Sequence, residues 1–76
     1  MPIPMSSRQI ADDLTARISG REYKPGTKLP SLRELSDLYS VSVSTVQRAL
    51  ELTRERGLTV GRAGSGVHVV DEPPQV

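Results

Sequence analysis

The chain has 76 residues and a formal net charge of +1, contains no cysteine, and has two tyrosines as its only aromatic residues. This length predicts one small domain, and the absence of cysteine excludes disulfides, thiol catalysis and cysteine-ligated metal centres. No apolar run reaches the length of a membrane span and the N-terminus lacks the apolar segment of a signal peptide, so a cytoplasmic protein is expected. Base-stacking surfaces that bind single strands would need more aromatic residues.

The charged residues are unevenly distributed. Between Lys24 and Gly66, seven basic residues stand against four acidic ones, which leaves three net positive charges in the centre of the chain. Such a segment can attract phosphate groups although the whole chain is nearly neutral. An ordinary solvated surface of mixed charge is the alternative interpretation of this distribution.

A helix is predicted after residues 1–6, which contain two prolines and are expected to form a flexible arm. Ser6 or Ser7 can cap this helix, and Gly20 is its expected end. Its apolar residues recur at helical spacing and predict one buried face, formed by Ile10, Ala11, Leu14 and Ile18. Asp12 and Asp13 are expected near the N-terminal end, where the helix dipole favours acidic residues.

A second helix is predicted from the sequence Ser31-Leu32-Arg33-Glu34, a capping box in which serine and glutamate satisfy each other's backbone amides. The preceding loop, 21–30, contains a Pro-Gly turn, and Thr27 to Leu29 form a possible short edge strand. The helix should end near Ser40. Its expected apolar stripe consists of Leu32, Leu35, Leu38 and Tyr39.

A third helix is predicted from a cap at Ser42 or Ser44 to Arg56, with Gly57 in the left-handed position that ends it. Its expected core face consists of Val46, Ala49, Leu50 and Thr53, with Leu52 at the flank. Ser44, Gln47, Arg48, Glu51 and Glu55 lie around the other side. The two glutamates have no companion acid in a pocket, so they are interpreted as part of a solvated face.

Two strands, 58–60 and 67–70, are predicted after the third helix, joined by the glycine-rich residues 61–66 as a hairpin. Residues 71–76 are acidic and proline-rich and are expected to form a linker or a disordered tail. The predicted fold class is therefore α+β, mainly α: a winged helix-turn-helix over residues 7–70, with three helices followed by a two-stranded β-hairpin wing. His68 stands alone on the second strand and is interpreted as a packing or surface histidine.

The third helix and the turn before it predict contact with DNA. A helix-turn-helix exposes the first turn of its second helix, which here carries Val43, Ser44 and Thr45. Small hydroxyls permit close approach, Val43 can meet a thymine methyl, and Gln47 can bond adenine at two atoms. A three-helix bundle with merely soluble exposed residues is the alternative, which the downstream hairpin makes less favoured.

Several blocks in order resemble the N-terminal DNA-binding domain of GntR-type bacterial transcription regulators. They are 25–31 (PGTKLPS), 33–35 (REL), 41–42 (VS), 45–46 (TV), 49–50 (AL), 57–58 (GL) and 64–66 (GSG). The resemblance implies that Arg33 contacts DNA, that Ser42, Ser44 and Thr45 begin the recognition helix, and that residues 64–66 form the wing tip. Members of the family often carry arginine at the positions of Val43 and Gln47, so the base preference here is expected to differ.

These inferences together predict a DNA-binding site without catalytic residues, metal or cofactor. Arg33 and Arg48 would position the domain on phosphates or bases, and Arg62 would contact phosphate or a narrow minor groove. The expected site consists of Ser31, Arg33, Ser42, Val43, Ser44, Thr45, Gln47, Arg48, Arg62, Gly64, Ser65 and Gly66.

The predicted function is transcriptional regulation by a non-enzymatic protein of the bacterial cytoplasm, associated with the nucleoid. The expected partners are double-stranded DNA and a second copy of the chain, which together form a homodimer on an inverted-repeat operator in the manner of a repressor. Neither a membrane nor a small-molecule effector is expected to bind this chain. The alternatives are an architectural or recombination accessory protein of mobile DNA and a winged helix that docks onto another protein.

Overall fold

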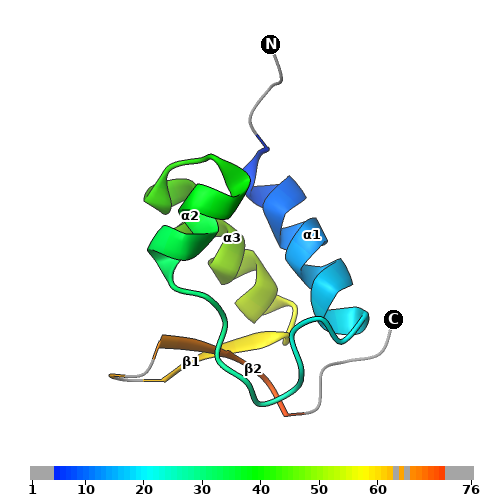
Figure 1. Ribbon diagram of the computed structural model, residues 1–76. Coiled ribbons are helices and arrows are strands. Elements are labelled where there is room, and N and C mark those ends of the chain that lie inside the picture. Colours follow the sequence, from blue (N-terminus) through cyan, green and yellow to red (C-terminus); the bar gives the residue numbers. More distant parts are fainter. Residues whose placement is uncertain (1–4, 63, 65, 72–76) are drawn as a thin grey trace.

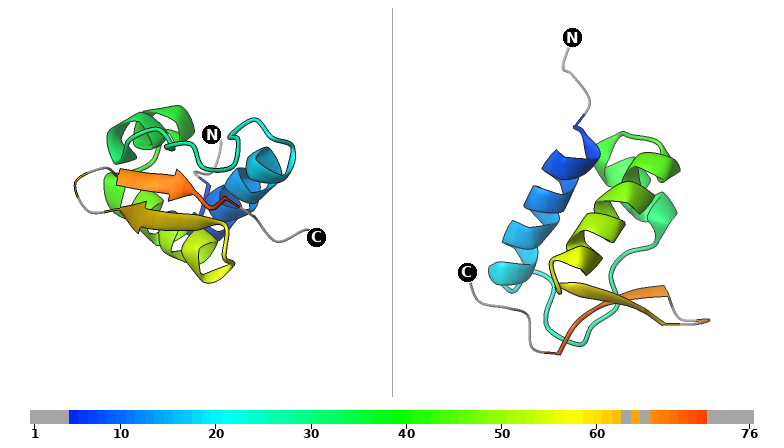
Figure 2. Two further views of the ribbon diagram at one scale, coloured as in Figure 1. Left: turned by 90° about the horizontal axis from the view of Figure 1, so that it is seen from below. Right: turned by 180° about the vertical axis from the view of Figure 1, so that it is seen from behind.

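The fold consists of three helices and a two-stranded antiparallel sheet, in a computed structural model that describes residues 5–62, 64 and 66–71. The sheet lies across one end of the helices, so the predicted winged-helix architecture is confirmed (Figures 1 and 2). In chain order the elements are α1 (Ser7–Ser19), α2 (Leu32–Tyr39), α3 (Val43–Glu55), β1 (Thr59–Arg62) and β2 (Gly66–Val69).

Each helix begins at a serine whose side chain accepts a hydrogen bond from a backbone amide in the first turn. The predicted capping box at Ser31 and Glu34 is present, and Ser6 forms a second one with Gln9. Ser42, and not Ser44, caps α3 by accepting from the amide of Thr45. These caps satisfy donors that would otherwise be unpaired, so the start of every helix is set by local sequence.

The described residues extend slightly beyond the predicted domain at its N-terminal end. Met5 packs against the core and Ser6 caps α1. The rest of the expected arm, residues 1–4, and all but one residue of the expected tail, 72–76, lie outside the described residues. The domain boundaries therefore stay a prediction.

The core forms where α3 packs against α1, α2 and β1. The predicted faces of α1 and α3 are confirmed, because every residue assigned to them is at most 8% exposed. Thr53 lies fully buried on α3, where its hydroxyl donates to the carbonyl of Leu50 at 2.8 Å and lies 2.9 Å from that of Thr59. Since a hydroxyl has one proton, Thr59 is the donor to Thr53, and this bond fastens β1 to α3.

The predicted apolar stripe on α2 is wrong at Leu38, whose side chain is 52% exposed. Leu35 is fully buried, and Leu32 and Tyr39 pack partly against the core. Successive helical residues are turned by about 100°, which places Leu32 and Tyr39 on the same side of Leu35 and Leu38 on the other. The buried stripe of this short helix follows Tyr39 and leaves Leu38 in solvent.

The expected dipole role of the two aspartates in α1 is also wrong. The first turn of α1 contains no acidic residue, since Asp12 and Asp13 lie in the middle of the helix. Asp13 forms an ion pair with Arg17 at 2.7 Å and accepts a hydrogen bond from the Tyr39 hydroxyl at 2.6 Å. Asp12 forms an ion pair with Arg56 at 2.9 Å. The two acids therefore tie α1 to the ends of α2 and α3.

The two paired strands extend further towards the hairpin turn than predicted. Gly61 and Arg62, expected in the connecting loop, continue β1 and pair with Val67 and Gly66. Gly66 starts β2 with a φ of +85°, a left-handed conformation that glycine tolerates. The connection is thus 63–65, of which only Gly64 is described, as a turn residue.

The possible edge strand at 27–29 is present as a single bridge between Lys28 and His68. The amide of Leu29 donates to the carbonyl of Val67 at 2.9 Å, and that of Val69 donates to the carbonyl of Thr27 at 2.9 Å. The segment before α2 is therefore held against β2, which fixes Lys28 next to the hairpin.

The hydrogen bonds to the Asp13 carboxylate should contribute folding stability that is lost in acid. The hydrogen bond from Tyr39, and next the one from Arg17, lowers the pKa of Asp13 below its ordinary value of 3.8. A lowered pKa stabilises the folded state above the pKa of the unfolded chain, and that stabilisation is lost as the pH falls through the folded value. We expect Asp13→Asn to be less stable than the parent chain at pH 7, with the difference shrinking towards pH 2.

Urea unfolding followed by circular dichroism at several pH values measures this difference. Asp37→Asn is the matched control, because Asp37 is exposed and forms no ion pair within the described part of the chain. A difference between Asp13→Asn and the parent that stays constant with pH would contradict the assignment.

Candidate DNA-binding surface

The first turn of α3 is exposed on the outside of the helix-turn-helix. Val43 is 40% exposed, Ser44 is exposed and Thr45 is half-buried. The Ser42 hydroxyl caps the helix and lies 3.2 Å and 3.0 Å from the hydroxyls of Ser44 and Thr45. These three hydroxyls form one compact polar end of α3, which is small enough to enter a groove.

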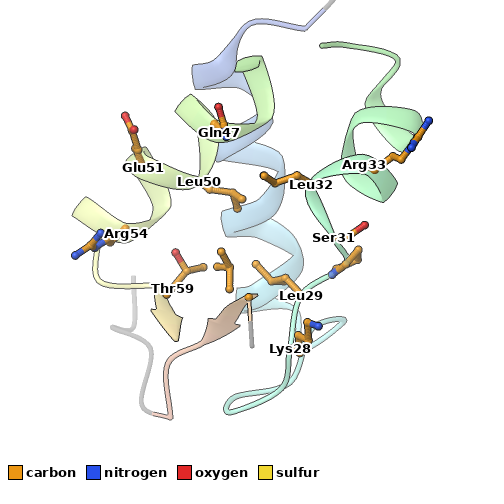
Figure 3. Close-up of a pocket in the computed structure, with 14 residues that line it drawn as sticks. Lys28, Leu29, Ser31, Leu32, Arg33, Gln47, Leu50, Glu51, Arg54 and Thr59 are labelled. Atoms are coloured by element: carbon orange, nitrogen blue, oxygen red, sulfur yellow. The ribbon is translucent and has the colours of Figure 1, made fainter. Parts of the chain in front are cut away.

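A cleft of about 710 Å³ lies beside α3, between the start of α2 and the sheet (Figure 3). Four residues of the predicted site line this cleft: Ser31 and Arg33 at the start of α2, Gln47 in α3 and Gly66 in β2. Residues from three separate parts of the sequence thus meet at one surface, as the winged-helix prediction requires.

The remaining predicted residues do not line the cleft. Arg48 is exposed on α3, and Arg62 is exposed at the end of β1. The end of β1 and the start of β2 lie on the side of α2 and α3, away from α1 (Figures 1 and 2). Gly64 is an exposed turn residue between them. Ser65 lies outside the described residues, so its predicted role has no structural counterpart. The candidate surface therefore has three parts: the cleft, the first turn of α3 and the hairpin end.

The cleft also contains three charged residues that the sequence analysis did not include in the expected site: Lys28, Arg54 and Glu51, the last interpreted there as part of a solvated face. Arg54 stands seven residues after Gln47, a helical spacing that places both side chains on one side of α3. This spacing could have identified Arg54 from the sequence. Lys28 is brought to the cleft by its bridge to β2; the sequence predicts a possible edge strand at 27–29 but not the strand with which it pairs.

The cations of the cleft are available for a ligand. Lys28, Arg33 and Arg54 are exposed, and none forms an ion pair within 4 Å among the described residues, whereas Arg17 and Arg56 are paired. The neighbouring acid Glu34 is engaged in the cap of α2, where hydrogen bonds from the backbone and then the side chain of Ser31 lower its pKa. With Glu51 as the one acid of the lining, the cleft carries two net positive charges, which suits a phosphate chain.

His68 does not contribute to this surface. Its side chain is 9% exposed, its Nδ1 has no hydrogen-bond partner among the described residues, and its backbone pairs with Lys28. The interpretation as a packing histidine agrees with this position. The described residues contain no group of three or more side chains that could hold a metal ion.

Comparison with known proteins places this arrangement among bacterial regulators. Residues 6–69 match the family described as bacterial regulatory proteins, gntR family. The uncharacterized HTH-type transcriptional regulator YisV of Bacillus subtilis is 41% identical over 64 residues, which is 84% of this chain and 13% of YisV. The Exu regulon transcriptional regulator of Escherichia coli is 38% identical over 68 residues, 90% of this chain and 26% of that protein. The chain thus spans about a quarter or less of the length of these two relatives.

Solved structures show the same fold. A GntR family transcriptional regulator from Listeria monocytogenes superposes with a TM-score of 0.81 at 29% identity, over 87% of this chain and 58% of that one. The DNA-binding domain of AraR, solved in complex with operator ORX1, gives a TM-score of 0.81 at 24% identity, over 92% of each chain. At that identity the second likeness is one of fold alone.

Two glycines of the cleft make a matched pair for testing the shape of the wing. A Cβ at Gly66 would stand 3.0 Å from Lys28 Cε on a left-handed backbone, whereas one at Gly61 would meet nothing within 4 Å. We expect Gly66→Ala to lower the free energy of unfolding by roughly 1–2 kcal/mol, the cost of a left-handed alanine. Gly61→Ala should stay within about 0.5 kcal/mol of the parent. Thermal unfolding of both variants measures this, and equal stabilities would contradict the described start of β2.

Proposed function

The chain belongs to the GntR family of bacterial regulatory proteins, and on this basis we propose that it binds double-stranded DNA sequence-specifically and regulates transcription. The observation that carries the proposal is the cleft beside α3, where Gln47 lies among the cations Lys28, Arg33 and Arg54, none of which forms an ion pair within the described part of the chain. The AraR domain, which has the same fold and was solved in complex with an operator, supports the proposal.

The three parts of the surface suit different parts of a duplex. Ser44, Thr45 and Gln47 would read base edges in the major groove from the start of α3, and Val43 would contact a thymine methyl. Arg33 and Arg48 would hold phosphates on either side, with Ser31 beside Arg33. Arg62 and residues 64–66, Ser65 included, would approach the minor groove from the hairpin.

We further propose that two copies bind an inverted repeat and act as a repressor. One domain offers few base contacts, and two copies on half-sites about one helical turn apart would double them. Occupied grooves would exclude other proteins from the same site. The proposed place of action is the bacterial nucleoid in the cytoplasm. None of the helices in the described residues is long and apolar enough to cross a membrane.

Salt dependence of DNA binding tests the proposed function. We expect the chain to prefer a selected duplex over a random one, and its affinity to fall with salt concentration. The logarithmic slope should decrease by about 0.9 in magnitude in Arg33→Gln, because one phosphate contact is lost. Arg8→Gln in α1 is the matched control, since Arg8 is exposed but lies outside the cleft.

Fluorescence anisotropy with labelled duplexes at several salt concentrations measures both quantities. Equal affinity for selected and random duplexes would contradict sequence-specific binding. An unchanged slope in Arg33→Gln, or an equal change in Arg8→Gln, would remove Arg33 from the phosphate contacts. Strong bending of the bound duplex in a circular permutation assay would favour an architectural role over repression.

A further inference from the structure

Glu51 lies on the base-reading side of α3. It follows Ser44 by seven residues, so at about 100° per residue its side chain is turned by only about 20° from that of Ser44. It also follows Gln47 by four residues, and Figure 3 shows both side chains extending from the same side of α3. Both residues line the cleft and both are exposed. Glu51 therefore lies on the same exposed face of α3 as Ser44 and Gln47.

Among the described residues, no hydrogen bond or ion pair engages the Glu51 carboxylate. Arg48 and Arg54 stand three residues before and after it, yet Glu51 forms no ion pair within 4 Å in the described part of the chain. The other charged residues that line the cleft are the cations Lys28, Arg33 and Arg54. A carboxylate facing DNA repels every phosphate nearby, so it weakens binding to all sequences unless it meets a hydrogen-bond donor on a base.

We propose that Glu51 is a specificity-determining residue that accepts a hydrogen bond from the N4 amino group of a cytosine in the major groove. An ionised carboxylate can only accept hydrogen bonds. The donors that bases present in the major groove are the amino groups of cytosine and adenine. Adenine presents its N7 acceptor beside the amino group, where it would repel the second carboxylate oxygen. Cytosine has no such neighbour, and guanine and thymine offer acceptors only.

The spacing on α3 predicts where this cytosine lies. Four residues of helix rise by about 6 Å, and two steps of duplex DNA by about 6.8 Å. With α3 along the groove, the base pair read by Glu51 lies about two steps from the one read by Gln47. This inference rests on the proposed DNA binding, and it adds a second base to the recognition sequence.

In vitro selection of bound duplexes by the 76-residue chain, followed by sequencing, tests the inference. The parent, Glu51→Gln and Glu51→Ala are compared, with Glu55→Ala as the matched control. Glu55 is an exposed acid one turn further along α3 that does not line the cleft, so its removal changes the net charge equally. Anisotropy titrations with single-base variants of the selected duplex then give the preference at each position.

We expect one cytosine that the parent prefers roughly 5- to 150-fold over other bases, the equivalent of roughly 1–3 kcal/mol. Glu51→Ala should lose that preference alone, Glu51→Gln should shift it to adenine, and Glu55→Ala should keep it. Preferences identical to the parent in both Glu51 variants, or a uniform gain in affinity for all duplexes, would overturn the role of Glu51. A parent that selects no sequence would instead overturn the proposed function itself.

Discussion

The burial of one face of α3 is the constraint on which the rest of the structure depends. This helix packs against α1, α2 and β1, and its residues Val46, Ala49 and Thr53 are fully buried. A chain without disulfides has one small core to hold it together, so this face cannot turn outward. The opposite face is then fixed as well, and it carries Ser44 and Gln47 to the surface. The orientation of the recognition face follows from packing and requires no contact with DNA.

Most of the fold could be predicted from the sequence because its signals are local. Serine caps and apolar spacing act within one or two turns, which is why the start of α2 at Ser31 and the buried face of α3 were predicted correctly. The exposure of Leu38 could not be predicted, because packing against the neighbouring helices determines which side of the short apolar stripe is buried. The dipole role expected for Asp13 fails for a local reason, because Asp13 lies in the middle of α1, whereas its contact with Tyr39, 26 residues away, has no local signal.

The residues of the candidate site also fall into those that local signals predict and those that depend on long-range contacts. Residues of α3 and of the capping box could be listed from spacing and resemblance, and Arg33 and Gln47 do line the cleft. Lys28 could not, because it reaches the cleft through a bridge to β2. The positions where the family often carries arginine hold Val43 and Gln47 here. In the proposed function the cations of the cleft contact phosphates, while uncharged side chains and Glu51 contact bases. The residues that build the fold therefore differ from those that determine the base preference.

The claim that DNA binds a surface built around α3 is tested most directly by a nuclear magnetic resonance titration of the labelled chain with a selected duplex. We expect the amide signals of residues 31–33, 42–51 and 61–67 to shift, because the start of α2, the exposed face of α3 and the hairpin approach DNA together. Signals of the outer face of α1, such as Arg8 and Ala16, should change little. Shifts centred on α1, or confined to the hairpin with α3 unaffected, would contradict a surface built around α3.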